Sequence, residues 1–224
     1  MADQVDPRAL TVAVLGGTGD QGQGLAYRLG GAGVHVIIGS RDEQRAKTFA
    51  AAVDAEVGGT VEGAANDEAS ERADVVIVAV PWAAHEPTLR DLTEQLAGKI
   101  VVDCVNPLGF DAHGPYRIDV AAGSAAQQAG TLLPRSRVVA AFHNVSASLL
   151  MDATVDDLDQ DVLVLGDDRP ATDLVRALAE LMPGVRGLFA GRLRNAGQVE
   201  ALTANLIAIN RRYKARSGIR ITGV

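Results

Sequence analysis

Several features that define other classes of protein are scarce in this chain of 224 residues. Its single cysteine, Cys104, excludes an internal disulfide and any metal site built from a cysteine cluster. Lysine and arginine total 21 against 28 aspartates and glutamates, so the formal charge is −7. This excess of acid argues against a nucleic-acid-binding protein, which usually carries a basic face. No apolar run approaches the roughly 20 residues that span a bilayer.

The rest of the composition is that of a globular protein. Apolar residues make up 47% and charged residues 22% of the chain, which excludes a disordered polymer. The length fits one domain, or one domain with a small appendage. Residues 1–6 are acidic and lack the basic and apolar regions of a signal peptide. We therefore expect a soluble cytoplasmic protein with small-molecule ligands and no nucleic-acid or membrane partner.

Short apolar runs recur along the chain and predict alternating strands and helices. The runs are rich in valine and isoleucine without alternating polar residues, which is typical of parallel strands buried on both faces. We expect strands at residues 10–15, 34–38, 74–80, 99–105, 137–142 and 161–165. The segments between and after them allow helices at residues 23–29, 42–53, 66–73, 84–96, 118–128 and 170–182. This order predicts an α/β fold with an open, doubly wound, mainly parallel sheet.

The pattern changes after the last clear strand. Residues 184–191 indicate a turn or a short edge strand, and residues 192–216 indicate one long helix. We place a domain boundary near Met151. Residues 1–150 then form a nucleotide-binding domain, and residues 151–224 form a small C-terminal helical or α+β part that packs over the sheet.

Glycine is unusually frequent, with 24 residues in the chain against an average of about 7%. Five glycines lie within residues 16–24, directly after the first expected strand, and Gly17, Gly19 and Gly22 have the spacing G-x-G-x-x-G. The first glycine permits a tight turn, the second lets the backbone approach a pyrophosphate, and the third permits close helix–strand packing. The following helix N-terminus favours phosphate binding. We therefore predict a Rossmann-type dinucleotide site, although a plain glycine-rich turn would have the same residues.

The end of the second expected strand indicates which dinucleotide is bound. A site selective for NAD usually has an acidic residue there, bonded to the ribose 2′-hydroxyl. This chain has Ser40 and Arg41 instead, with Arg45 one helical turn beyond Arg41. Two guanidinium groups and a hydroxyl suit a 2′-phosphate, so we predict NADP(H). The alternative is an ordinary solvated helix start, where Asp42 and Glu43 would also be favourable.

Ligands of open α/β sheets bind outside the carboxyl ends of the strands. Val80 ends the third expected strand and is followed by Pro81 and Trp82. Asn106 follows the fourth strand and His143 the fifth. We interpret Trp82 as a wall of the cofactor site rather than a core residue. His143 is either a substrate-side residue or a structural histidine.

Groups for acid–base chemistry are few. The chain lacks a serine elbow and a histidine-rich metal motif, and Cys104 has no histidine partner in a recognisable motif, so we expect no metal. Its three lysines, Lys47, Lys99 and Lys214, are poorly placed as acids for carbonyl reduction. A nucleotide site with little acid–base machinery favours hydride transfer, for which the cofactors supply the chemistry and the protein supplies orientation.

Four motifs together resemble the NADPH-dependent reductases of coenzyme F-420. They are Gly16-Gly17-Thr18-Gly19, Gly39-Ser40-Arg41, Pro81-Trp82 and the late Phe142-His143-Asn144. The resemblance extends over nearly the whole chain and includes Gly166-Asp167-Asp168 and Leu202-Thr203. It implies reversible hydride transfer between NADPH and the 8-hydroxy-5-deazaflavin coenzyme F-420, and a homodimer.

The resemblance also implies roles for individual residues. Thr18, Gly19, Asp20 and Gln21 would hold the pyrophosphate, and Ser40, Arg41 and Arg45 the 2′-phosphate, with Arg45 where the family often has lysine. Trp82 and Ala147 would line the nicotinamide region, and His143 and Val145 would contact the deazaflavin, with His143 orienting and polarising it. The full cofactor-binding prediction is Gly17, Thr18, Gly19, Asp20, Gln21, Gly22, Ser40, Arg41, Arg45, Val80, Pro81, Trp82, Asn106, His143, Val145 and Ala147.

Two other functions remain open at this point. One is an NADP-dependent reductase of another small substrate, such as an imine or a keto acid. Relatives of that kind typically have a larger helical substrate domain, for which this chain has little length. The other is a non-enzymatic NADP-sensing module, which would need no second ligand crevice and would leave Trp82 and His143 without a role.

Overall fold

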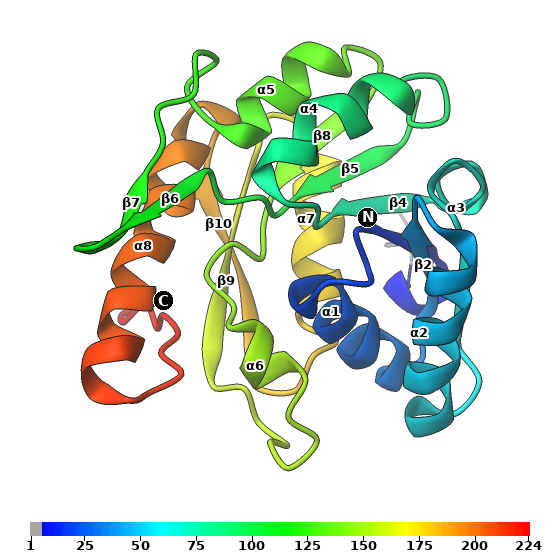
Figure 1. Cartoon of the computed structure of the whole chain (residues 1–224), viewed down its shortest axis with the longest axis horizontal. Helices are drawn as coiled ribbons and strands as arrows, with labels where there is room; N and C mark the ends of the chain where they lie inside the picture. The colour runs from blue at the N-terminus through cyan, green and yellow to red at the C-terminus, as the bar shows by residue number, and fades with distance from the viewer. Residues whose placement is uncertain (1–5) are drawn as a thin grey trace.

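A single eight-stranded sheet forms the centre of the protein, as the computed structural model of residues 6–224 shows (Figure 1). The strand order is β10-β9-β8-β5-β4-β1-β2-β3. The strands are β1 (Thr11–Leu15), β2 (His35–Ser40), β3 (Val61–Ala65), β4 (Val75–Val78), β5 (Ile100–Asp103), β8 (Arg137–Ala140), β9 (Gln160–Gly166) and β10 (Val185–Gly191). Neighbours from β3 to β8 are parallel, whereas β9 is antiparallel to β8 and parallel to β10. The predicted doubly wound, mainly parallel α/β fold is confirmed.

Helices cover both faces of the sheet. They are α1 (Asp20–Gly31), α2 (Glu43–Val57), α3 (Asn66–Arg72), α4 (Trp82–Asp91), α5 (Ala125–Leu132), α6 (Ala147–Leu150), α7 (Arg169–Ala179) and α8 (Ala196–Tyr213). Val12 and Val14 of β1 join the core beneath α1, α2 and α7, whereas Ala13 and Leu15 join the core beneath α3, α4 and α5. Successive side chains of a strand point to opposite faces, so both faces of β1 are buried and the run has no polar alternation.

Several elements differ from the sequence prediction. The strand β3 was not expected, and neither was the antiparallel hairpin of β6 (Leu108–Asp111) and β7 (Gly114–Arg117). The helix expected over residues 118–128 begins only at Ala125, because Ser124 Oγ caps its N-terminus by accepting a hydrogen bond from Gln127 N at 3.0 Å.

The C-terminal part extends the sheet. β9 and β10 follow the boundary predicted at Met151 and join the same sheet as β8, so the expectation that residues 151–224 pack over the sheet is wrong for these strands. The sequence of an apolar run does not show which strand it will pair with, or whether the pairing will be parallel or antiparallel. α8 instead packs against α5 and β7, and its end lies at Tyr213 because Lys214 adopts a left-handed conformation with φ 51°.

Among residues 6–224, none of the helices combines the length and the apolar character that crossing a membrane would require.

Candidate functional site

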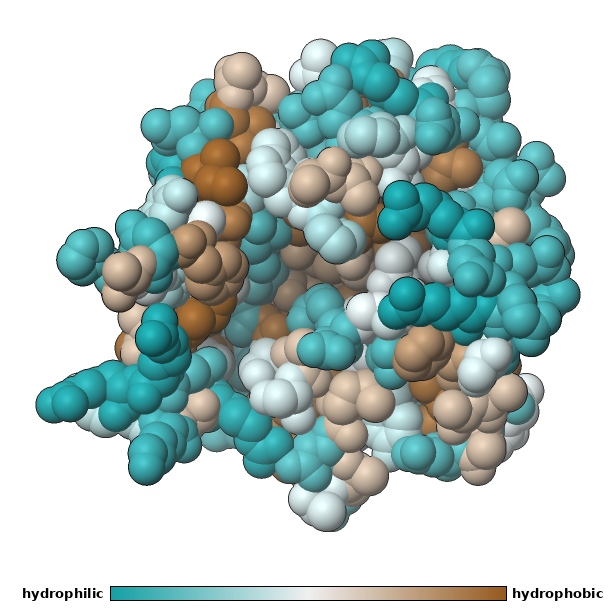
Figure 2. Space-filling view, in the orientation of Figure 1, coloured by the Kyte–Doolittle hydropathy of each residue, from teal (hydrophilic) through white to brown (hydrophobic). Residues whose placement is uncertain are grey.

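Two adjoining cavities lie at the carboxyl ends of the central strands. We call the first, of about 510 Å³, the nucleotide cavity; the glycine turn, the end of β2 and the start of α4 line it. We call the second, of about 360 Å³, the ring cavity; it lies among the ends of β4, β5 and β8, the start of α6 and one side of α8. Gln21, Ala79, Val80 and Pro81 line both. Figure 2 shows this face of the molecule hollowed between α8 and α1.

The glycine turn has the geometry that the motif predicts. A Cβ on Gly17 would lie 2.7 Å from the Val14 carbonyl oxygen, and one on Gly22 would lie 2.6 Å from the Cα of Gly17. These positions therefore require glycine for the turn and for close packing of α1. Gly19 is the N-cap of α1, and the nearest atom to its added Cβ is the Gly16 oxygen at 3.5 Å. The space at Gly19 is therefore open to a ligand, next to the free N–H groups of the helix.

The end of β2 presents two cations to the nucleotide cavity. Ser40, Arg41 and Arg45 all line it. Asp42 accepts a hydrogen bond from Arg45 N at 3.0 Å and so caps α2. Within residues 6–224, neither Arg41 nor Arg45 forms an ion pair with a carboxylate. Both guanidinium groups are therefore available to an anionic ligand.

Part of the predicted cofactor-binding set lines the ring cavity. Its lining includes Val80, Pro81, Trp82, Asn106, His143, Val145 and Ala147. The other predicted residues, Thr18, Gly19, Asp20 and Gln21, line the nucleotide cavity, while Gly17 and Gly22 shape the turn behind it. The sequence prediction did not include Thr203, Leu206, Ile207 and Asn210 of α8 or Ser217, which also line the ring cavity.

His143 is a buried histidine without a hydrogen-bond partner for its ring. The residue is 2% exposed, and neither ring nitrogen bonds to any group in the described residues. Burial lowers the pKa of His143 to about 4, against a small opposing effect of the Asp103 charge. The imidazole is therefore neutral at pH 7, with one donor and one acceptor nitrogen. Both remain for a ligand of the ring cavity.

The backbone around His143 is held from two sides. Its carbonyl oxygen accepts hydrogen bonds from Asn106 Nδ2 at 3.2 Å and from Thr203 Oγ1 at 2.8 Å. Phe142, the preceding residue, has φ 65°, a conformation that costs a non-glycine residue free energy and is enriched at functional sites. Asn106, which follows β5, and Thr203 of α8 thus hold the backbone that carries this imidazole.

A buried pair behind Trp82 was not expected from the sequence. His85 Nε2 lies 2.6 Å from Asp103 Oδ2, and both side chains are fully buried. Burial lowers the pKa of His85, but the hydrogen bond and the charge of Asp103 outweigh it and raise the pKa overall. The ring centroids of His85 and Trp82 are 5.4 Å apart. The pair therefore supports the indole that lines the ring cavity. The i, i+3 spacing of Trp82 and His85 on α4 is a sequence signal for their contact, but no local spacing indicates Asp103 as the partner of His85.

Glu200 is a second buried acid outside the prediction. Its carboxylate accepts hydrogen bonds from Ala125 N at 2.9 Å and Ala126 N at 3.1 Å, at the N-terminus of α5. Burial raises the pKa of Glu200 to about 7, against these backbone hydrogen bonds, which lower it. Glu200 therefore links α8 to α5 and titrates near neutral pH.

Cys104 lines the ring cavity but is not a reactive thiol. Its Sγ donates to the Val78 carbonyl oxygen at 3.1 Å, and burial raises its pKa well above the ordinary value. The thiolate that a nucleophile requires is therefore absent at neutral pH. The described residues also contain no group of three or more histidines, cysteines or acids placed to hold a metal ion.

Comparison with known proteins gives consistent matches. Residues 11–107 match the family described as "NADP oxidoreductase coenzyme F420-dependent". The chain is 44% identical to the F420-dependent NADP reductase of Methanothermobacter marburgensis, over 96% of this chain and 99% of the relative. It is 38% identical to the enzyme of that name in Methanocaldococcus jannaschii, over 96% and 99% of the two chains.

A solved structure has the same fold. It is described as a putative F420-dependent NADP reductase from Arthrobacter and superposes with a TM-score of 0.80 at 28% identity, over 95% of this chain and 99% of that one. An imine reductase from Myxococcus stipitatus superposes with a TM-score of 0.62 at 16% identity, over 92% and 67% of the two chains. The second likeness shows the shared fold alone.

Proposed function

Since the chain belongs to the family of F-420-dependent NADP oxidoreductases, we propose that it transfers a hydride reversibly between NADPH and the deazaflavin coenzyme F-420. The observation that carries the proposal is the pair of joined cavities. One has a phosphate-binding turn and two arginines without a carboxylate partner in residues 6–224, and the other has a buried imidazole without a hydrogen-bond partner in the same residues. Two ring systems that exchange a hydride need such adjoining spaces.

NADP(H) is assigned to the nucleotide cavity. Thr18, Gly19, Asp20 and Gln21 surround the N-terminus of α1, which favours a pyrophosphate. Ser40, Arg41 and Arg45 provide one hydroxyl and two cations at the end of β2, where a 2′-phosphate would bind. Val80 and Pro81 line both cavities and so lie where the nicotinamide would pass from one to the other.

The deazaflavin is assigned to the ring cavity, which the nicotinamide would enter past Val80 and Pro81. Trp82 and Ala147 would line the nicotinamide region, and His143 and Val145 would contact the deazaflavin. A deazaflavin has carbon at its reactive position and accepts a hydride there as a nicotinamide does. Because its imidazole is neutral, His143 supplies hydrogen bonds that orient and polarise the ring, and it does not act as a cationic acid at pH 7.

Mixing the protein with NADPH and F-420 under anaerobic conditions tests the function. We expect the absorbance of oxidised F-420 to fall together with that of NADPH. A folded protein that binds NADPH but leaves F-420 oxidised would contradict the proposal, and parallel incubation with an imine or a keto acid would then identify the alternative reductase. Binding of NADPH without turnover of any substrate would favour the sensor.

A homodimer and a cytoplasmic location are further parts of the proposal. So is the absence of a nucleic-acid partner, which rests on the net charge of −7.

Exposed apolar side chains support the dimer: Phe110 and Tyr116 on the β6–β7 hairpin are 66% and 50% exposed, and Tyr213 at the end of α8 is 73% exposed. Figure 2 shows apolar surface where this hairpin and α8 lie. Light scattering on the purified protein measures the mass, and a monomer at micromolar concentration would refute this part.

A further inference from the structure

The last residues of the chain supply one wall residue of the ring cavity, Ser217. We call residues 214–224 the C-terminal strap. It turns back from α8 at Lys214, and Ser217 then lines the ring cavity. Ser217 N and Oγ both donate to Asn210 Oδ1, at 2.6 and 2.8 Å, which fixes this wall against α8. Further along, the Ile219 carbonyl oxygen accepts a hydrogen bond from Asp161 N at 2.7 Å.

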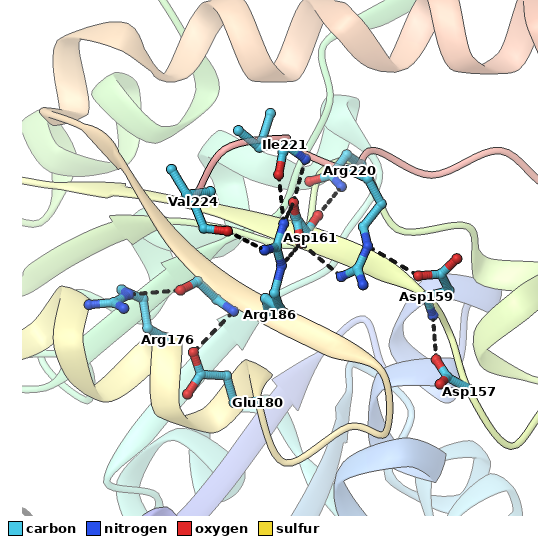
Figure 3. Close-up of polar contacts among 11 residues, drawn as sticks. Asp157, Asp159, Asp161, Arg176, Glu180, Arg186, Arg220, Ile221 and Val224 are labelled. Atoms are coloured by element: carbon cyan, nitrogen blue, oxygen red, sulfur yellow. Dashed lines mark hydrogen bonds and ion pairs between the residues drawn. The ribbon is translucent and has the colours of Figure 1, made fainter.

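The strap is held by one buried carboxylate, that of Asp161 on β9 (Figure 3). Asp161 is fully buried and accepts two hydrogen bonds from Arg186 on β10, each at 2.7 Å. It accepts two more from the strap itself, from Ile221 N at 2.6 Å and Arg220 Nη1 at 3.2 Å. We call Asp161, Arg186 and Arg220 the clasp.

Arg186 also contacts the strap directly. Its guanidinium donates to the carbonyl oxygens of Ile221 and Val224, both at 2.8 Å. Arg220 forms a second ion pair, with Asp159 at 3.1 Å. Burying a carboxylate is costly unless it is paired and hydrogen-bonded. The strap therefore completes the set of partners that Asp161 needs, and the geometry couples burial of Asp161 to placement of the strap.

The main chain of Asp161 also contacts a second residue that lines the ring cavity. The Asp161 carbonyl oxygen accepts a hydrogen bond at 2.7 Å from Nδ2 of Asn144, which follows His143 in sequence. Asn144 and Ser217 both line the ring cavity. Asp161 is thus bonded to the loop that carries His143 and to the strap that carries Ser217, whereas the nucleotide cavity contains no residue of the clasp or the strap.

We propose that Asp161, Arg186 and Arg220 are positioning residues that hold the C-terminal strap as a wall of the ring cavity, and so set the affinity for the deazaflavin without affecting that for NADPH. This inference rests on the proposed function for its substrate. A second anchor, Arg216 with Asp152 at 2.5 Å, ties the strap to the segment after α6. Loss of the clasp alone therefore frees the C-terminal end of the strap, while the Arg216–Asp152 ion pair still holds its start.

Steady-state kinetics of Arg220→Ala tests the proposal, because Arg220 is about half exposed and Asp161 keeps Arg186 in this variant. We expect the KM for F-420 to rise about tenfold, equivalent to ~1.4 kcal/mol, while kcat and the KM for NADPH stay within twofold. Arg220→Lys keeps the charge and should recover part of the loss. Deletion of residues 217–224 should raise the KM for F-420 further. Arg135→Ala, which breaks an exposed ion pair with Glu94, is the matched control.

Limited trypsin digestion gives a readout that does not need turnover. Lys214 and Arg216 are cleavage sites at the start of the strap, and mass spectrometry detects its loss. We expect faster cleavage in Arg220→Ala than in wild type or Arg135→Ala, and protection by F-420 but not by NADPH.

The outcomes separate the two proposals. A KM for F-420 within twofold of wild type in both Arg220→Ala and the deletion would overturn the clasp, as would equal rises in the KM values of both substrates. If the wild type failed to reduce F-420, the proposed function would be wrong. The trypsin rate would then decide the clasp alone: faster cleavage in Arg220→Ala supports it, and an unchanged rate overturns it.

Discussion

Selectivity for NADPH over NADH should depend on Arg41 and Arg45. Both line the nucleotide cavity at the end of β2, and neither has a carboxylate partner in the described part of the chain. Replacing both by alanine removes the two cations that we assign to the 2′-phosphate. NADH lacks this phosphate, so its binding provides an internal control.

The magnitude follows from the number of contacts. One charge-assisted hydrogen bond contributes about 1.5–3 kcal/mol, and solvent exposure at this site favours the lower end. Arg41→Ala should therefore weaken NADPH binding about tenfold, and the double variant Arg41→Ala/Arg45→Ala about a hundredfold, at 1.4 kcal/mol per factor of ten. The affinity for NADH should change by less than twofold.

Fluorescence titration of both nucleotides at two salt concentrations measures these values. The loss should shrink at high salt, because exposed ionic contacts are screened. Lys47→Ala is a matched control, since Lys47 lies on α2, the helix that carries Arg45, and pairs with Glu43 instead of facing the nucleotide cavity. Unchanged NADPH affinity in the double variant, or an equal loss for NADH, would refute the assignment of these arginines.

Three further predictions follow from the site. His143→Ala should raise the KM for F-420 about tenfold while kcat remains measurable, and unchanged values of both KM and kcat would refute its role. In the wild type, pH profiles of the rate between pH 6 and 8 should show no inflection from this residue, because its pKa is about 4. Gly22→Ala should lower the free energy of unfolding by roughly 1–3 kcal/mol, since its Cβ would meet the Gly17 backbone at 2.6 Å; urea unfolding that matches wild type would contradict this. Glu200 has its pKa raised to about 7, so its contribution to stability is present below pH 4.5 and is lost as the pH rises through 7. The free energy of unfolding of wild type, relative to that of Glu200→Gln, should fall by about 2 kcal/mol between pH 5 and 8. The same difference between the two proteins at both pH values would show that the carboxyl does not titrate in this range.

Local patterns in the sequence predicted the core of the fold and the cofactor turn. The unalternated run at residues 10–15 indicated a strand buried on both faces, as β1 is. The glycine spacing predicted a turn in which Gly17 and Gly22 have no room for a side chain. In the structure, a Cβ at either position would clash with backbone atoms. These predictions succeed because burial of a strand and close approach of the backbone in a turn each constrain residues that are adjacent in the sequence.

Features that depend on distant residues could not be predicted. The strand β3 contains the partly exposed Glu62 and Gly63 and follows Gly58 and Gly59, so its sequence lacks an apolar run. The direction of β9 depends on its pairing with β8. The His85–Asp103 pair and the clasp around Asp161 join residues from separate elements, which no local spacing reveals.

Isotope transfer tests the central claim, that the two cavities bring the rings of NADPH and F-420 into direct contact. NADPH carrying deuterium at the transferred position of its nicotinamide would be oxidised by the enzyme with F-420 in ordinary water, without oxygen. Mass spectrometry of the product measures the label. Direct transfer predicts one deuterium in each reduced F-420 molecule when the label is on the transferred face and none when it is on the opposite face. Reduced F-420 that carried solvent hydrogen in both cases would contradict direct hydride transfer between the cavities.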